Sequence, residues 1–244
     1  MRCAIVIPAR MASTRFPGKP LCDILGKPMV QWVWEAAQAS GVADKVLVAT
    51  PDDEIAEACR TFGAEAILTS LDHQTGTDRI AEVAAKVQAD VYVNVQGDEP
   101  LMTAAAIEAC ARPLLDDAGI QMGSLYCECP ERDFGDPAVV KVVTDVLGFA
   151  LYFSRHCIPF ARNARVVPVK KHIGLYAYTR DALLAFARLP MGFLEKAESL
   201  EQLRFLENGV GIYMAAGTGT ELAVDTPEQA LQVQAILEAR QGGL

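Results

Sequence analysis

The chain has 244 residues, of which 51% are hydrophobic and 22% are charged, and its formal net charge is −9. This length and composition predict a globular protein with a substantial core and exclude a disordered chain. The acidic balance argues against general nucleic-acid binding and against a polybasic membrane contact, because both need an extended basic surface.

Strand-like and helix-like segments alternate through the first half of the chain. Apolar, β-branched runs predict strands, and apolar residues at helical spacing predict helices, two of which end before Gly41 and Gly63. In chain order we expect a strand at 3–7, a helix at 29–39, a strand at 45–49, a helix at 52–62, a strand at 66–68, a helix at 77–87 with Thr77 as its N-cap, a strand at 91–95, a helix at 104–115 and a strand at 121–126. This rhythm predicts a parallel sheet with helices on both faces.

The pattern changes after residue 126. Here we expect strands at 139–144, 150–153 and 169–178, helices at 180–188 and 198–207, a strand at 211–216 and a closing helix at 227–240. No linker rich in Ser, Gly or Pro separates the two parts. We therefore expect one α/β domain over residues 1–244, with a nucleotide-binding half at 1–125. The part at 126–244 is expected to be α+β and to cover the site or form a dimer contact.

The cysteines and the N-terminus bear on the compartment. The seven cysteines are scattered and include no CxxC pair, which predicts reduced and mostly buried thiols. The N-terminus has no secretory-signal pattern, and no apolar run approaches the roughly 20 residues that span a bilayer. We therefore expect a cytoplasmic protein without membrane insertion.

A cation-rich loop directly follows the first predicted strand. Arg10, Arg15 and Lys19 lie within ten residues of one another, and Gly18 precedes the lysine. Backbone N–H groups at such a strand end, together with cations, can hold a polyphosphate. The alternative is a solvated turn with chance cations, and neither P-loop spacing nor a G-x-G-x-x-G pattern is present. We favour the phosphate interpretation and expect the loop to be exposed.

Two further loops are expected at the same edge of the sheet. In segment 69–79, Gln74 and the loop backbone can bond the edge of a base, and Arg79 can reach a phosphate. An ordinary capped helix entrance explains this segment equally well. The turn Gln96-Gly97-Asp98 follows the strand at 91–95. A carboxylate at a strand end near a phosphate loop favours Mg²⁺, bound jointly with phosphate oxygens, over a plain tight turn.

The remaining candidates each have a structural alternative. Asp225 can be a second metal ligand, but Asp225 or Thr226 with Pro227 in the first turn is better explained as a helix cap. Arg155 can clamp a carboxylate in a bidentate manner, and His172 can bond sugar hydroxyls or a carboxylate. A lone Arg or His is more often structural, so the residues alone leave these roles open.

A set of motifs in a fixed order covers essentially the whole chain. They are Pro8-Ala9-Arg10-x-x-Ser13-x-Arg15-x-Pro17-Gly18-Lys19-Pro20-Leu21, Asp72-His73-Gln74-x-Gly76-Thr77-x-Arg79, Asn94-Val95-Gln96-Gly97-Asp98-Glu99-Pro100, Phe153-Ser154-Arg155, His172-Ile173-Gly174-Leu175-Tyr176, Leu200-Glu201-Gln202-Leu203-Arg204 and Val224-Asp225-Thr226-Pro227-Glu228. This set resembles the 3-deoxy-manno-octulosonate cytidylyltransferase (CMP-Kdo synthetase) family. The resemblance implies a Rossmann-like, mostly parallel sheet of the nucleotide-diphospho-sugar transferase type, with an α+β insertion that forms the sugar site and dimer contact.

The resemblance also implies an activity and a set of site residues. It implies transfer of CMP from CTP to the anomeric hydroxyl of Kdo, with release of pyrophosphate, by a homodimer that activates Kdo for lipopolysaccharide biosynthesis. By this likeness CTP is bound by Pro8, Ala9, Arg10, Ser13, Arg15, Lys19, Asp72, Gln74, Thr75, Gly76, Arg79, Gln96 and Gly97. Asp98 and Asp225 hold Mg²⁺ and act in catalysis with Arg10 and Lys19. The sugar acid is faced by Arg155, His172, Tyr176, Glu201 and Gln202.

The expected mechanism is in-line attack on the α-phosphorus, with deprotonation assigned to Mg²⁺ because no side chain is identified as a general base. The chain departs from the family pattern in a short stretch at 161–171 and at 190–195, where the usual Pro-Ser-x-Leu-Glu is not kept. Both border the proposed sugar pocket, so a variant such as 8-amino-Kdo, or another sugar acid, is an alternative substrate. A nucleotide-binding regulator without turnover is the alternative of another class. The pairing of Asp98 with Asp225 argues against it.

Overall fold

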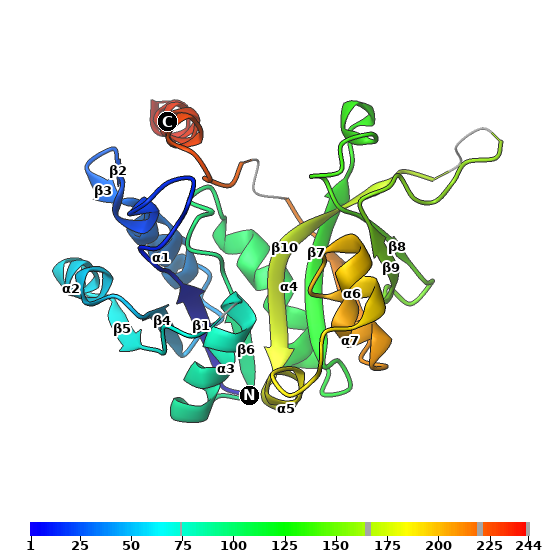
Figure 1. The fold of residues 1–244 in the computed structure, drawn as a ribbon, viewed down its shortest axis with the longest axis horizontal. Coiled ribbons are helices and arrows are strands. Elements are labelled where there is room, and N and C mark those ends of the chain that lie inside the picture. Colours follow the sequence, from blue (N-terminus) through cyan, green and yellow to red (C-terminus); the bar gives the residue numbers. More distant parts are fainter. Residues whose placement is uncertain (74, 164–166, 219–221, 243–244) are drawn as a thin grey trace.

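The computed structural model describes residues 1–73, 75–163, 167–218 and 222–242, which form one large sheet, a small ribbon and flanking helices (Figure 1). The strands are β1 (Cys3–Pro8), β2 (Asp23–Ile24), β3 (Lys27–Pro28), β4 (Lys45–Thr50), β5 (Glu65–Leu68), β6 (Val91–Asn94), β7 (Met122–Glu128), β8 (Lys141–Thr144), β9 (Ala150–Ser154), β10 (Lys170–Thr179) and β11 (Ile212–Ala216). The helices are α1 (Met29–Ala39), α2 (Asp53–Thr61), α3 (Gly76–Lys86), α4 (Ala104–Asp116), α5 (Arg180–Phe186), α6 (Phe193–Glu198), α7 (Leu203–Glu207) and α8 (Pro227–Gly242), with 3₁₀ turns η1 (Lys19–Leu21) and η2 (Glu131–Asp133). None of the helices in these ranges is long and apolar enough to cross a membrane.

The large sheet is parallel through the first half of the chain. Its strand order is β11-β7-β10-β6-β1-β4-β5, with β1 parallel to both β4 and β6, and β4 parallel to β5. Strand β10 enters antiparallel between β6 and β7 and so separates β7 from the other early strands. Strand β8 pairs with the start of β10 and with β9, which extends the sheet away from the nucleotide-binding half. The predicted mostly parallel α/β sheet is confirmed, with β10 as its antiparallel insertion.

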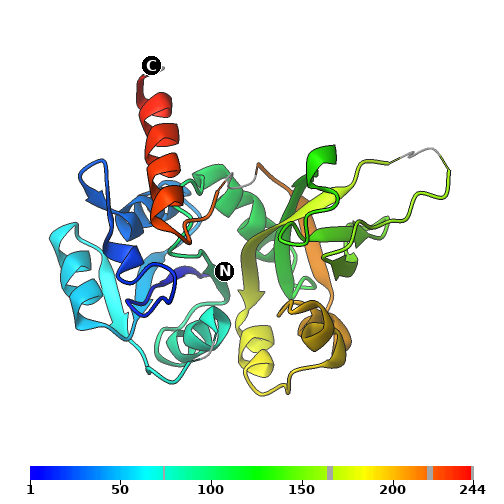
Figure 2. The same cartoon turned by 45° about the horizontal axis from the view of Figure 1, so that its top comes forward.

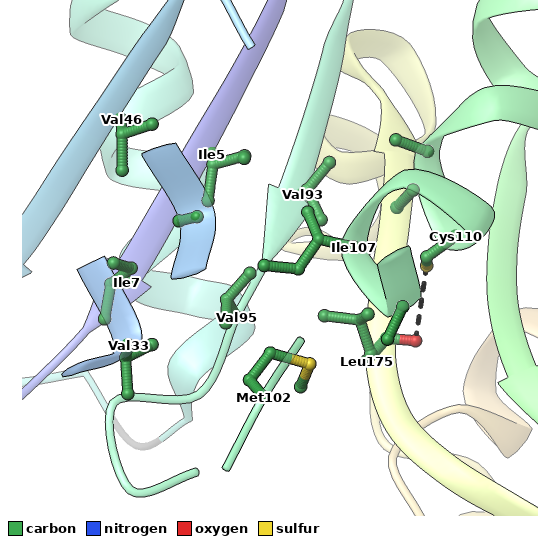
Figure 3. Close-up of a cluster of buried hydrophobic side chains, with 14 of the residues drawn as sticks. Ile5, Ile7, Val33, Val46, Val93, Val95, Met102, Ile107, Cys110 and Leu175 are labelled. Atoms are coloured by element: carbon green, nitrogen blue, oxygen red, sulfur yellow. Dashed lines mark hydrogen bonds between the residues drawn. The ribbon is translucent and has the colours of Figure 1, made fainter. Parts of the chain in front are cut away.

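Alternate residues of the central strands enter two separate cores. Ile5 and Ile7 pack with residues of α1, α2 and α4 on one face, whereas Ala4 and Val6 pack with α3, α5 and α7 on the other. Figure 3 shows part of the first core, where the thiol of Cys110 also donates to the Leu175 carbonyl oxygen at 3.5 Å. Burying one such aliphatic side chain stabilises the fold by about 1.5–3 kcal/mol. These two apolar layers hold the strand ends, and thus their loops, in fixed positions.

The closing helix α8 returns to the first half of the chain (Figure 2). A third apolar cluster joins Val233 of α8 to Ile24, Met29 and Leu101, and Val224 lies buried in the same cluster. The backbone N–H of Val224 donates to the Asp98 carbonyl oxygen at 2.8 Å. The segment before α8 is therefore held against the Gln96-Gly97-Asp98 turn that follows β6. In the sequence, Asp98 and Val224 are 126 residues apart.

Most predicted elements lie within two residues of the observed bounds, and α1 matches its prediction at both ends. Two predictions were wrong. Of the helix expected at 198–207, only Leu203–Glu207 is helical, as α7; the unpredicted α6 ends at Glu198, and Ser199 takes a left-handed conformation with φ of 52°. Helix α3 is capped by Thr75 rather than Thr77: the Thr75 side chain accepts from the Asp78 N–H, and the Asp78 carboxylate accepts from the Thr75 N–H.

Candidate active site

The loops after β1, β5 and β6 and the segment before α8 meet around one cavity. Its volume is about 640 Å³, within the usual range of small-molecule sites. It lies at the carboxyl ends of the parallel strands, where open α/β sheets bind their ligands. The lining residues are Pro8, Ala9, Arg10, Ala12, Ser13, Thr14, Arg15, Lys19, Pro20, His73, Thr75, Gly76, Arg79, Gln96, Gly97, Asp98 and Asp225.

The opening loop is closed on itself by backbone hydrogen bonds. The Gly18 N–H donates to the Met11 carbonyl oxygen at 3.0 Å, and Gly18 has a φ of 73°, a conformation that favours glycine. The Met11 N–H in turn donates to Asp52 Oδ2 at 2.7 Å, which ties the loop to the start of α2. The chain thus holds Arg10 and Arg15 on an ordered loop with both side chains exposed.

The turn after β6 packs closely against the end of β1. A Cβ at position 97 would lie 2.8 Å from the Pro8 carbonyl oxygen, so Gly97 allows a contact that another residue would prevent. Gln96 lines the cavity, and its Nε2 donates to Asn94 Oδ1 at 3.1 Å. This close packing brings Asp98 next to Lys19 of the opening loop.

Two carboxylates and two cations that line the cavity form ion pairs with one another. Lys19 Nζ lies 2.7 Å from Asp98 Oδ2 and 3.3 Å from Asp225 Oδ1, and Arg15 Nη2 lies 3.0 Å from the same Asp225 oxygen. The Lys19 side chain is only 12% exposed, which corrects the expectation that the whole loop is exposed. The ammonium group therefore lies between two carboxylates that come from opposite halves of the chain.

Asp225 faces the cavity and does not cap α8. Thr226 is the cap: its Oγ1 accepts from the Gln229 N–H at 3.4 Å, and the Gln229 Oε1 accepts from the Thr226 N–H at 3.0 Å. The helix-cap interpretation of this segment is thus correct for Thr226, and the Asp225 carboxylate is left for the ion pairs with Arg15 and Lys19.

The second loop contributes Thr75, Gly76 and Arg79 to the cavity. Arg79 is 3% exposed, and its Nη1 donates to Thr69 Oγ1 and to the Ser70 carbonyl oxygen, so it also holds the loop together. Asp72 lines a neighbouring cavity of about 460 Å³ instead. Gln74, predicted to bind CTP, lies outside the described residues.

The five residues assigned to the sugar acid lie outside this lining, in the second part of the chain. The Arg155 guanidinium donates to three backbone carbonyl oxygens, those of Glu198 at 2.7 Å, Pro137 at 2.8 Å and Ser199 at 3.2 Å. In this structure Arg155 is therefore engaged with the backbone between α6 and α7. The carbonyl oxygens of Glu198 and Ser199, at the end of α6, thus accept from Arg155 rather than only from a continued helix.

The other sugar-acid candidates are largely buried. His172 Nε2 lies 3.0 Å from Ser124 Oγ, and burial lowers the pKa of His172 to about 3. This imidazole is thus neutral at physiological pH, so it can share hydrogen bonds but offers no positive charge to a carboxylate. Tyr176 packs against it with ring centroids 5.4 Å apart. Gln202 is 4% exposed, and its Nε2 has no hydrogen-bond partner within the described chain.

Glu201 joins this group to the nucleotide loop. Its Oε1 accepts a hydrogen bond from the Thr77 hydroxyl, one residue beyond Gly76 in the cavity lining. Sequence reasoning missed this role of Thr77, which it assigned as a helix cap. It also identified no partner for His73, which lines the cavity and lies 2.5 Å from Glu82 Oε2. Neither contact has a sequence signal, because each depends on how α3 packs against later or neighbouring elements.

Comparison with known proteins decides the family. The family model for cytidylyltransferases matches residues 4–212. The chain is 50% identical to the 3-deoxy-manno-octulosonate cytidylyltransferase of Geobacter metallireducens over 93% of this chain and 94% of that protein. The chain belongs to the 3-deoxy-manno-octulosonate cytidylyltransferase family. A member of this family from Escherichia coli is 45% identical, over 97% of this chain and 96% of its own length.

The fold of this cytidylyltransferase agrees with that of a solved structure. The chain superimposes on a CMP:2-keto-3-deoxy-manno-octonic acid synthetase complexed with CTP with a TM-score of 0.96 and 42% identity. The match covers 98% of this chain and 100% of that one. The family resemblance inferred from the motifs is thereby confirmed, and so is its α/β fold.

Proposed function

We propose that this protein transfers CMP from CTP to the anomeric hydroxyl of Kdo and releases pyrophosphate, which activates Kdo for lipopolysaccharide biosynthesis. The observation that carries this proposal is the cavity that Arg10, Arg15 and Lys19 line together with Asp98 and Asp225. Cations beside a pair of carboxylates suit a triphosphate bound with a divalent metal. The likeness to a synthetase solved with CTP supports the choice of nucleotide.

In this proposal the triphosphate lies along the opening loop. Arg10, Ser13, Arg15 and Lys19 hold the phosphates, and the first N–H groups of α3 add donors at the helix N-terminus. The end of β1 at Pro8 and Ala9, together with Gln96 and Gly97, borders the nucleoside. Asp72, Gln74 and Arg79 are assigned to CTP by family likeness, and the Arg79 contacts support a role in shaping the loop.

The chemistry of the donor set fits a magnesium ion. Asp98 and Asp225 already share one cation, the Lys19 ammonium, and Mg²⁺ is commonly bound by one or two carboxylates with phosphates and waters. Among the described residues no cluster of three or more His, Cys, Asp or Glu side chains forms a self-contained metal site, so phosphate oxygens would complete the coordination. When bound, the ion would lower the pKa of the attacking hydroxyl and offset charge on the departing pyrophosphate.

The side chains of the protein contribute positioning and charge. Attack in line at the α-phosphorus requires the triphosphate to be held with its pyrophosphate opposite the sugar hydroxyl. Arg15 and Lys19 can neutralise that pyrophosphate once it replaces the carboxylates as their partner. We propose that the sugar acid is bound by Arg155, His172, Tyr176, Glu201 and Gln202.

Pyrophosphate release tests the proposal directly. With Mg²⁺ present, we expect release with CTP plus Kdo, and none with either substrate alone or after chelation of the metal. A panel of 8-amino-Kdo and other sugar acids tests the substrate alternatives. Turnover with 8-amino-Kdo and none with Kdo would overturn the sugar assignment, and CTP binding without turnover on any sugar acid would favour a regulator.

We also propose that the protein acts in the cytoplasm as a homodimer. No disulfide joins the seven cysteines, all of which lie among the described residues, as in proteins of reducing compartments. Exposed apolar side chains occur around β9: Val146 is 101%, Leu147 72% and Leu151 63% exposed. We expect light scattering to give twice the chain mass, and Leu151→Asp to shift the protein toward monomer. Leu231→Asp, at a 69% exposed leucine of α8, should leave the mass unchanged, whereas a monomeric wild type would contradict the proposal.

A further inference from the structure

Thr77 lies behind the cavity and connects the two halves of the chain. It is the second residue of α3 and is 2% exposed, and its neighbours Thr75 and Gly76 line the cavity. Its hydroxyl donates to Glu201 Oε1, 124 residues further along the chain. The entrance of α3, on the nucleotide side, is thus bonded directly to the segment that precedes α7, on the sugar side.

The polar contacts continue from Thr77 to the nucleotide side of the cavity. Burial raises the pKa of Tyr178, on β10, and hydrogen bonding to the side chains of Thr77 and Asn94 opposes that shift. Asn94 is 1% exposed, and its Oδ1 accepts from Nε2 of Gln96, which lines the cavity. A buried path of polar side chains therefore runs from Gln96 through Asn94, Tyr178 and Thr77 to Glu201.

The charge of the Glu201 carboxylate depends on the hydrogen bonds at this end of the path. Burial raises the pKa of Glu201, and the hydrogen bonds from Thr77 and Thr75 oppose that shift by favouring the charged carboxylate. Buried polar groups in a low-dielectric interior hold one geometry when each has its partner, and they lose it when one partner is removed. Loss of the Thr77 hydroxyl would thus release the carboxylate from its position and weaken its charged form.

We propose that Thr77 is a positioning residue: it fixes the Glu201 carboxylate for the sugar acid and, through Tyr178 and Asn94, links that carboxylate to Gln96 beside the nucleotide. The inference rests on the proposed function, because Glu201 is assigned to the sugar acid there. It adds a role for a residue that does not line the nucleotide cavity.

Steady-state kinetics with CTP, Kdo and Mg²⁺ test the role of Thr77. For Thr77→Val, which removes the hydroxyl and keeps the shape, we expect KM for Kdo to rise about 10- to 100-fold, the range for loss of a hydrogen bond to a charged group. KM for CTP should change by less than about threefold, because the lining residues stay in place. Thr77→Ser, which keeps the hydroxyl, should restore KM for Kdo. In a Glu201→Ala background, Thr77→Val should raise it no further.

The controls separate a positioning role from a structural one. Thr103→Val removes a threonine that caps α4 and does not line the cavity, and should lower thermal stability without altering either KM. Equal rises in both KM values for Thr77→Val, or no change in KM for Kdo, would overturn the inference. Wild-type protein without turnover on CTP and Kdo would instead overturn the proposed function, so the two failures are distinguishable.

Discussion

Replacing Asp98 by alanine is expected to lower kcat for CMP transfer on the order of 10³-fold, with little loss of folding free energy. Asp98 Oδ2 and Asp225 Oδ1 both contact Lys19 Nζ, so the two carboxylates lie close enough to share one cation. With Asp225 alone, the site keeps half of the negative charge that would hold Mg²⁺ beside the triphosphate. The Asp98 side chain is 34% exposed, so its truncation leaves no sealed cavity in the fold.

Three measurements on Asp98→Ala separate the metal role from a structural one: pyrophosphate release, the thermal unfolding midpoint, and Mn²⁺ affinity of the nucleotide-free protein by electron paramagnetic resonance. We expect Mn²⁺ affinity to fall together with kcat. Glu35→Ala is a matched control, because its carboxylate is 36% exposed and pairs with Lys27 at 2.7 Å outside the cavity lining. That variant should keep kcat within about twofold. Unchanged turnover in Asp98→Ala would remove this residue from the proposed metal site.

Replacing Lys19 by alanine is expected to lower kcat about 10²- to 10³-fold by removing a cation from the pyrophosphate side of the reaction. The effect on metal binding should have the opposite sign to that of Asp98→Ala. The Lys19 ammonium lies between the two carboxylates, so its removal leaves them free to accept another cation. We therefore expect Mn²⁺ affinity of the nucleotide-free protein to be maintained or to rise.

The burial of Lys19 requires a second variant. Its side chain is 12% exposed, so Lys19→Ala removes packing as well as charge. Lys19→Met keeps the apolar stem and removes only the ammonium group. Equal loss of kcat in both variants, with the methionine variant as stable as wild type, would assign the effect to the charge. If both variants unfold at assay temperature while Asp98→Ala stays folded, Lys19 has a structural role in the loop.

Local signals were sufficient to predict most of the fold. Helix α1 follows from its apolar spacing and the nearby Gly41, and strands β1 and β6 follow from short apolar, β-branched runs. The helix expected at 198–207 was wrong at its start: α6 ends at Glu198, and the carbonyl oxygens of Glu198 and Ser199 accept from Arg155, a partner more than forty residues earlier that leaves no local signal. The antiparallel entry of β10 between β6 and β7 likewise has no local signal, since strand order is set by packing.

The candidate site, like the fold, was predicted from the sequence only in part. The order of the motifs predicted one catalytic site made of Arg10, Lys19, Asp98 and Asp225. The structure brings these residues to one cavity. The residues alone favoured a cap for the segment at Asp225, and only the geometry separates Thr226, which caps α8, from Asp225, which faces Lys19. Thr77 was misassigned because its partner Glu201 is distant in sequence.

By itself, the sequence determined that this is an acidic α/β protein whose cation-rich loop follows the first strand, and its motifs determined the family. Those properties are carried by residue type, spacing and order, which are local in the chain. The tertiary structure decided which charges meet, because Lys19 reaches Asp225 only when α8 folds back on the first half. It also decided that Glu201 is bonded to the entrance of α3, because that contact joins elements whose separation along the chain says nothing of their distance in space.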